Sequence, residues 1–182
     1  MNAAIGTATP RPWFSLSMAL RASALLIGSL FLCSAPAAKA ERLPYPLRFF
    51  EGATEMVSTV DLITREPYKA RTIGQGKIQP DGSLVLVQRV EDEGKKPYQR
   101  RWHMKQVAPG RYVGTMSEAR GPVTAEEVGD RFRFRFKLKG GVSVEQWIIP
   151  LAGGRAAHSL ITIKKLGIKV GSSTGMITRS LR

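Results

Sequence analysis

The sequence predicts an all-β protein, an antiparallel up-and-down β-barrel of about 8–10 strands. Apolar and charged residues alternate strictly along one segment, turn-forming residues recur at intervals of about 8–15 residues, and no stretch of about 12 residues shows a helical period. Consecutive hairpins without crossover helices form an antiparallel sheet. Closing that sheet into a barrel removes its exposed edges. A β-sandwich is the alternative architecture.

The clearest predicted strand lies at residues 130–139. Its side chains alternate between an apolar face and a cationic face, as expected for a strand that is buried on one side. Gly129 precedes the strand, and Gly140-Gly141 after it is a strong hairpin signal. The apolar face consists of Phe132, Phe134, Phe136 and Leu138, and the cationic face of Arg131, Arg133, Arg135, Lys137 and Lys139.

Turn signals divide the rest of the chain after residue 40 into further strands. Pro80-Asp81-Gly82-Ser83 is one such turn, because proline, aspartate and glycine each favour a turn position. A short helical turn is expected before the first strand, at residues 46–51. The other strands are expected at residues 53–63, 69–79, 84–90, 98–107, 111–118, 123–128, 142–149, 156–165 and 168–181.

The first forty residues predict a secretory signal peptide. A basic segment at residues 18–21 precedes an apolar run at 22–32, and Ala38-Lys39-Ala40 is a cleavage site of the A-x-A type. The apolar run is shorter than the about 20 residues that cross a bilayer as a helix. We therefore expect cleavage after Ala40, a single mature domain at residues 41–182, and a periplasmic or secreted protein.

Two features of this N-terminal segment stay open. Lipoprotein processing would instead cut before Cys33 and anchor the protein through a lipid on that cysteine. The start codon encodes Met1 or Met18, because the residues from Met18 onward form a complete signal by themselves.

A series of short motifs runs through about 130 residues of the mature domain. The motifs are Phe49-Phe50-Glu51-Gly52, Glu91-Asp92-Glu93-Gly94, Arg101-Trp102, Tyr112-Val113-Gly114, Glu118-Ala119-Arg120-Gly121, residues 129–138, Gln146-Trp147-Ile148 and Lys165-Leu166-Gly167-Ile168-Lys169-Val170-Gly171. Their order and spacing resemble an uncharacterised family of bacterial envelope proteins, domain of unknown function 3833, which is regarded as lipocalin-like. The resemblance implies a lipocalin-like barrel in the cell envelope, with an apolar ligand and no known catalytic residues. This chain departs from the pattern at Gln88 and Gln146, where acids are usual, and at Arg120, where an apolar residue is usual.

Five aromatic side chains are the candidate lining of a ligand pocket: Trp102, Phe132, Phe134, Phe136 and Trp147. Barrels of about eight or more strands can hold one small ligand between such side chains. The expected ligand is an apolar or amphipathic, lipid-like small molecule. The alternative is that the rings form a packed core. We also expect Trp102 to stack against Arg100 or Arg101.

The mature domain is strongly basic. Removing Arg11, Arg21 and Lys39 with the signal segment lowers the net charge from +14 to +11. The candidate contact with an anionic membrane surface is the cationic face formed by Arg131, Arg133, Arg135, Lys137 and Lys139, since each cation near such a surface contributes about 1 kcal/mol. A face that only keeps the domain soluble is the alternative. Export argues against nucleic acid, the usual partner of so basic a protein.

The sequence indicates no particular reaction. His103 and His158 are the only histidines and lack the spacing of metal ligands, and a single cysteine excludes an internal disulfide. Neither a nucleophile elbow nor a dinucleotide-binding loop is present. We therefore expect no catalytic residues, metal or cofactor. The alternatives are an enzyme acting on a lipid-like ligand, and a small outer-membrane barrel or structural envelope component.

Overall fold

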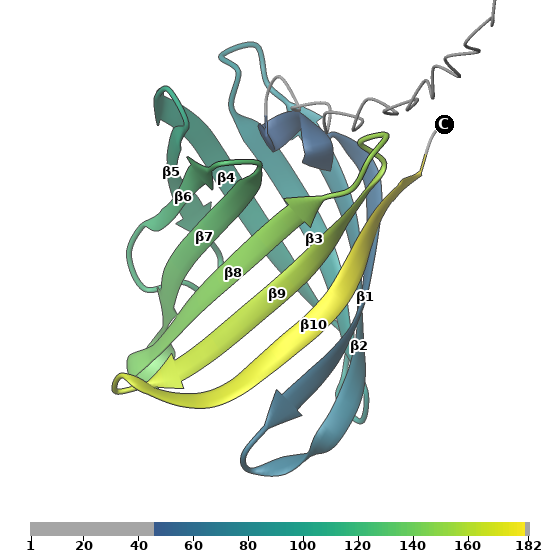
Figure 1. Cartoon of the computed structure of the whole chain (residues 1–182), viewed down its shortest axis with the longest axis vertical. Coiled ribbons are helices and arrows are strands. Elements are labelled where there is room, and N and C mark those ends of the chain that lie inside the picture. The colour runs from purple at the N-terminus through teal and green to yellow at the C-terminus, as the bar shows by residue number, and fades with distance from the viewer. Residues whose placement is uncertain (1–45, 181–182) are drawn as a thin grey trace, which may run out of the picture. The chain divides into compact units, whose positions relative to one another are not determined.

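The computed structural model describes residues 46–180, which form a closed barrel of ten antiparallel strands (Figure 1). Each strand pairs with the next one along the chain, and β1 also pairs with β10, which closes the sheet. This up-and-down order confirms the predicted fold class. The predicted signal peptide and the lipid attachment at Cys33 lie outside the described residues.

The strands follow the predicted turn signals closely. The largest difference is at β2, which begins at Arg65, whereas the sequence predicted a start at residue 69. The strands are β1 (Gly52–Leu62), β2 (Arg65–Ile78), β3 (Leu84–Asp92), β4 (Tyr98–Ala108), β5 (Arg111–Met116), β6 (Val123–Val128), β7 (Arg131–Leu138), β8 (Val142–Pro150), β9 (Ala156–Lys165) and β10 (Ile168–Ser180).

Helical structure among residues 46–180 is limited to two short 3-10 segments, η1 (Pro46–Phe50) and η2 (Lys139–Gly141). The first segment lies at the helical turn expected from the sequence. The second contains Lys139, so the prediction that this lysine belongs to the strand is wrong: β7 ends at Leu138 and the chain turns at the two following glycines. Within this part of the chain, no helix combines the length and the apolar character needed to cross a membrane.

One end of the barrel is covered by η1. Leu47 and Phe49 are each only 1% exposed, and the ring of Phe50 meets that of Phe134 edge-on, with centroids 6.3 Å apart. The segment lies so close to β2 that a Cβ atom at Gly76 would overlap the Phe50 carbonyl oxygen. We call this the closed end, and Figure 1 shows η1 beside the start of β1.

The opposite end carries the turns that join β1 to β2, β3 to β4, β5 to β6, β7 to β8 and β9 to β10, because every second turn of an up-and-down barrel lies at the same end. We call it the open end, only to distinguish it from the end that η1 covers. Side chains alternate along every strand between the barrel interior and the outer face. The interior positions are mainly apolar, and the core between the two ends includes Leu84, Leu86, Trp102, Met104, Tyr112, Met116, Val123, Phe132, Phe134, Ile148 and Ile177.

Candidate functional site

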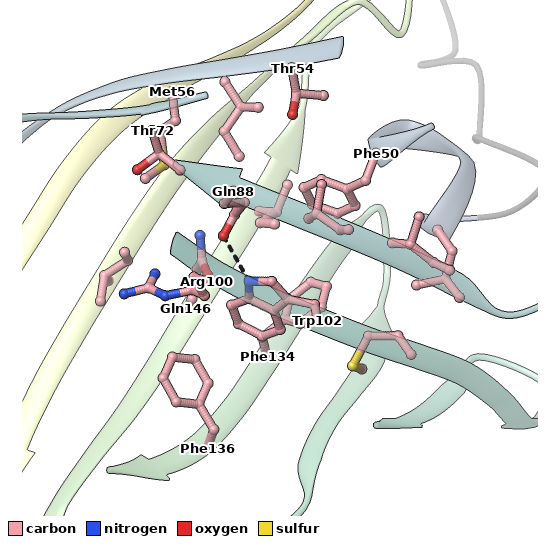
Figure 2. A pocket seen from close by; sticks show the side chains of 17 residues that line it. Phe50, Thr54, Met56, Thr72, Gln88, Arg100, Trp102, Phe134, Phe136 and Gln146 are labelled. Carbon is pink, nitrogen blue, oxygen red and sulfur yellow. Dashed lines mark hydrogen bonds between the residues drawn. The ribbon is translucent and has the colours of Figure 1, made fainter. Parts of the chain in front are cut away.

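The barrel interior contains a cavity of about 80 Å³ with largely apolar walls (Figure 2). Strand order and direction arrange its lining in levels from the closed end to the open end. On β3 and β4 the register gives three successive levels from the closed end: Leu84 with Met104, Leu86 with Trp102, and Gln88 with Arg100. Elsewhere in the wall Met56 lies opposite Thr72 and Phe134 lies opposite Gln146. The rest of the lining is Leu47, Phe50, Thr54, Phe136, Ile148, Ile161 and Ile177.

Trp102 lies at the centre of this lining. It is 7% exposed, and its ring meets that of Phe136 edge-on, with centroids 5.5 Å apart. The indole Nε1 donates a hydrogen bond to the side-chain oxygen of Gln88 at 2.7 Å. The expected stacking of Arg100 or Arg101 on this indole is not found; among residues 46–180, the arginine that stacks on a tryptophan is Arg133, on Trp147.

Gln88 is held in one orientation by this bond. An indole nitrogen can only donate, so the oxygen of the Gln88 amide must face it, and the amide nitrogen is left on the other side. Among residues 46–180, that nitrogen has no hydrogen-bond partner. It is therefore available to a group that enters the cavity.

Arg100 is the cationic residue of the cavity wall. The register pairs Gln88 with Arg100, and Arg100 shares the interior face of β4 with Trp102. Its Nε donates to Glu118 at 2.9 Å, and its Nη2 donates to the Tyr98 hydroxyl at 2.9 Å. Burial raises the pKa of Tyr98 above its ordinary value, and the nearby positive charge of Arg100 opposes that shift. The charge of Arg100 is balanced by Glu118, so the pair is electrically neutral together.

Gln146 completes the polar groups near the open end. Its side-chain nitrogen donates to the hydroxyl of Ser159 at 2.9 Å, and Ser159 is 1% exposed. In this orientation no donor within residues 46–180 binds the Gln146 oxygen, which can therefore accept. Gln88, Arg100 and Gln146 therefore present donors and one acceptor to the same space, and we call these three residues the polar mouth (Figure 2).

The sequence anticipated the aromatic lining in part. Trp102, Phe134 and Phe136 line the cavity as expected. Phe132 points into the core at 8% exposure but does not reach the cavity. Trp147 lies on the outer face, because its neighbours Gln146 and Ile148 occupy the interior positions of β8, so placing it in the pocket was wrong.

Trp147 has polar contacts on the outer face instead. The guanidinium of Arg133 lies 5.2 Å from its ring centre, and its Nε1 donates to Glu145 at 3.1 Å. It therefore packs against the cations of β7 rather than among the interior rings.

The predicted cationic face of β7 is partly neutralised. Arg133 and Arg135 both bind one oxygen of Glu126, at 2.6 Å and 2.8 Å, and Arg131 lies 3.6 Å from Asp130. Hydrogen bonding from Arg133 lowers the pKa of Glu126 below its ordinary value. Lys137 is outside this network, and no described acidic side chain forms a salt bridge with it.

The two histidines do not form a catalytic group. His103 Nε2 lies 3.1 Å from the hydroxyl of Ser83, and that hydroxyl donates to Asp81 at 2.6 Å. Because the single serine proton is directed to Asp81, His103 must donate to Ser83 and cannot act as its base. His158 lies exposed on β9. In the part of the chain that the structure describes, no group of three His, Cys, Asp or Glu residues could hold a metal ion.

No family model matches the chain, and no curated protein matches it. Its fold is similar to that of several solved structures. The S-type phycobiliprotein lyase CPES from Guillardia theta matches 75% of this chain and 91% of its own, with 9% identity and a TM-score of 0.61. Rv2717c from M. tuberculosis matches 75% of this chain and 96% of its own, with 11% identity and a TM-score of 0.56.

A third similar structure is a protein of unknown function from the DUF3598 family of Nostoc punctiforme, with 12% identity and a TM-score of 0.55. The match covers 74% of this chain but 48% of that protein, so the chain spans about half its length. At these identities the likeness shows the fold alone, a lipocalin-like barrel. The resemblance to domain of unknown function 3833 therefore rests on the sequence motifs.

Proposed function

We propose that this protein is an exported, lipocalin-like member of the domain of unknown function 3833 family that binds an apolar or amphipathic small molecule inside its barrel. The observation that carries the proposal is the polar mouth in the wall of an otherwise apolar cavity: Gln88, Arg100 and Gln146 face the same space that Trp102 and Phe134 line. Apolar walls with a few converging polar groups are typical of ligand sites. One of the similar barrels is a phycobiliprotein lyase, which is compatible with a scaffold that handles small molecules.

The cavity volume favours a slender ligand. At about 80 Å³ it is well below the about 300–1,000 Å³ of drug-sized sites, and below the about 150 Å³ that admits benzene in an engineered core. A ring system would require the surrounding side chains to move, whereas the end of an alkyl chain would require less rearrangement. We therefore propose a lipid-derived ligand whose chain points toward η1.

The polar mouth would hold the head group of that ligand. The Gln88 amide nitrogen and the remaining guanidinium nitrogen of Arg100, Nη1, are donors, and the Gln146 oxygen is an acceptor. Because Glu118 already balances the charge of Arg100, the head group can be a neutral alcohol, ester or amide as well as an acid.

The test starts from protein purified without detergent after expression of the full chain. Native mass spectrometry should show an adduct that solvent extraction releases as a lipid-like compound. After the adduct has been removed, decanol and decanoate should both bind the protein. The change in tryptophan fluorescence measures this binding. A bare mass together with no binding of either probe would contradict the proposal.

A matched pair of variants locates the binding. Ile161 lines the cavity, and its neighbour Leu160 is 40% exposed on the outer face of the same strand. Ile161→Phe should reduce adduct and probe binding at least tenfold, while Leu160→Phe should leave both within twofold. Equal binding by the two variants would place the ligand elsewhere. Circular dichroism checks that both barrels are folded.

The same sample tests export. The mass of a chain whose first residue is Glu41 would support cleavage of a signal peptide after Ala40. The mass of a chain that starts at a lipidated Cys33 would instead indicate a lipid-anchored protein. The outer-membrane barrel is less favoured, because its lipid-facing surface would have to be apolar. On the outer face of the observed barrel, Arg71 pairs with Glu55 at 2.6 Å and with Glu91 at 3.6 Å.

A further inference from the structure

Five lysines gather at one side of the open end. They lie on the last residues of β7 and β9, in η2, and at the start of β10: Lys137, Lys139, Lys164, Lys165 and Lys169. None of them forms a salt bridge with a residue in the range 46–180. Between residues 137 and 169 the sequence has a single acid, Glu145, which accepts a hydrogen bond from Trp147.

The register places several of these lysines side by side. Lys164 is directly opposite Lys169 on one side and Ser143 on the other, and Ser143 is opposite Lys137. Like charges opposite one another destabilise a sheet. This row of cations therefore does not stabilise the fold, and its charge is available to an external anion.

Exposed apolar side chains lie among these lysines. Leu166 is 82% exposed and Ile168 is 70% exposed, and Lys165 is directly opposite Ile168. Ile63 is 75% exposed at the neighbouring turn, and its backbone N–H donates to the Val170 carbonyl at 3.1 Å. Leu166 therefore lies in the β9–β10 turn, Ile168 at the start of β10, and Ile63 in the β1–β2 turn. Figure 1 shows the β7–β8 and β9–β10 turns side by side.

Leu166 also adopts an unfavourable backbone conformation. Its φ is 50°, the left-handed region, where glycine or asparagine is normally found. No other described residue except glycine has a positive φ. The leucine is nearly fully exposed, so packing against the barrel does not compensate for this backbone cost. Strained positions of this kind cluster at functional sites.

We propose that this rim, defined by Leu166, Ile168 and the five lysines, docks on the surface of an anionic phospholipid bilayer. Leu166 and Ile168 enter the headgroup region, and the lysine ammonium groups pair with lipid phosphates. Separate apolar tips on turns offer little flat area to a folded protein partner, whereas a bilayer surface accommodates each tip independently. The proposal is independent of the ligand cavity, and it moves the expected membrane contact from the arginines of β7 to the turns at the open end.

Vesicle sedimentation tests the docking. The protein, purified after expression of the full chain, should bind vesicles of equal parts phosphatidylglycerol and phosphatidylcholine at about 0.1 M salt. It should bind pure phosphatidylcholine at least tenfold more weakly, and high salt should release it, because charge attraction is screened. Absence of binding to the anionic vesicles would overturn the proposal.

Paired variants separate the rim from general surface charge. Lys164→Gln with Lys165→Gln should weaken binding about twenty-five-fold, at about fivefold per cation. The matched control is Lys77→Gln with Lys105→Gln, two exposed lysines near the closed end, which should change binding less than threefold. Equal losses in the two pairs would show that only the net charge matters and would overturn the assignment to the rim.

The apolar tips have their own control. Leu166→Asn should weaken vesicle binding at least fivefold without loss of folding, because asparagine tolerates the left-handed backbone. Val107→Asn, at a 54% exposed position of the closed end, should leave binding within twofold. Unchanged binding of Leu166→Asn would exclude insertion. Native mass spectrometry that shows a dimer of the wild type and a monomer of Leu166→Asn would overturn membrane docking. The rim would then be the contact with a second copy of the chain. Ile161→Phe, which fills the cavity, should still sediment with vesicles. Vesicle binding therefore tests the docking surface even if the ligand proposal fails.

Discussion

The indole nitrogen of Trp102 donates to the side-chain oxygen of Gln88 across neighbouring strands, at 2.7 Å. Trp102 directly faces Leu86 in the register, so the bond runs diagonally from one cavity level to the next. It ties the apolar part of the cavity to the polar mouth. Since the indole is 7% exposed, its N–H has little access to water as an alternative partner.

Gln88→Leu should therefore lower the free energy of unfolding by about 1–3 kcal/mol, the usual cost of a buried donor left without a partner. Gln88→Glu is the matched control, because it keeps an acceptor at the same place and should cost less. Urea unfolding measures both. Equal stability of wild type and Gln88→Leu would mean that water reaches the indole through the polar mouth.

Gly76→Ala should disturb the closed end. The added Cβ would meet the backbone oxygen of Phe50, which a side-chain rotation cannot relieve. We expect a loss of about 1–3 kcal/mol, as for other overpacked sites, together with a weaker near-ultraviolet circular dichroism signal from the phenylalanines of η1. Gly94→Ala is the comparison, since its Cβ would meet no atom within 4 Å. Its only cost in stability is the backbone strain of an alanine at a φ of 76°. An unchanged signal for Gly76→Ala would contradict this packing.

The strands and their order could be predicted because period-two alternation and turn residues are local signals. Residues 131–138 show this most clearly, with every second side chain apolar. Turn residues at Asp81-Gly82 and Gly140-Gly141 then set where each strand stops. Nine successive hairpins between ten strands favour closure of β1 on β10, because closing the sheet removes its exposed edges.

The interior polar groups were missed for a physical reason. Arg100 shares a face with Trp102 two residues later, but a cation next to an aromatic suggested stacking rather than an interior position. Its partner Glu118 is distant in sequence, so the ion pair becomes visible only after folding. The alternation along β8 could have been used to assign these positions. With Val144 in the interior, Gln146 also faces inward and Trp147 faces outward.

Leu166→Asn should stabilise the barrel. A non-glycine residue in the left-handed region costs about 1–2 kcal/mol, and asparagine recovers part of that cost. We expect a gain of about 0.5–1 kcal/mol in the free energy of unfolding. Ile63→Asn removes a similarly exposed apolar side chain, 75% against 82%, where φ is not positive, so it should bring no gain. Leu166 would then lower the stability of the barrel while contributing to docking, as expected for a stability–function trade-off. A loss of stability in Leu166→Asn would contradict this prediction.

Glu126 should make the stability of the barrel depend on pH in the acid range. Arg133 and Arg135 both bind its Oε1, and the hydrogen bond from Arg133 is the main cause that lowers the Glu126 pKa in the folded protein. A lowered native pKa means that the ionised carboxylate stabilises the fold above the unfolded value of about 4.3, and that this contribution disappears as the pH falls through the native pKa. Glu126→Gln should therefore lower the urea midpoint at neutral pH and converge with wild type in acid, whereas Glu66→Gln, at an exposed position of β2, should run parallel to wild type throughout. If the Glu126→Gln and wild-type curves keep a constant separation down to the lowest pH, the arginine pair does not carry the acid sensitivity.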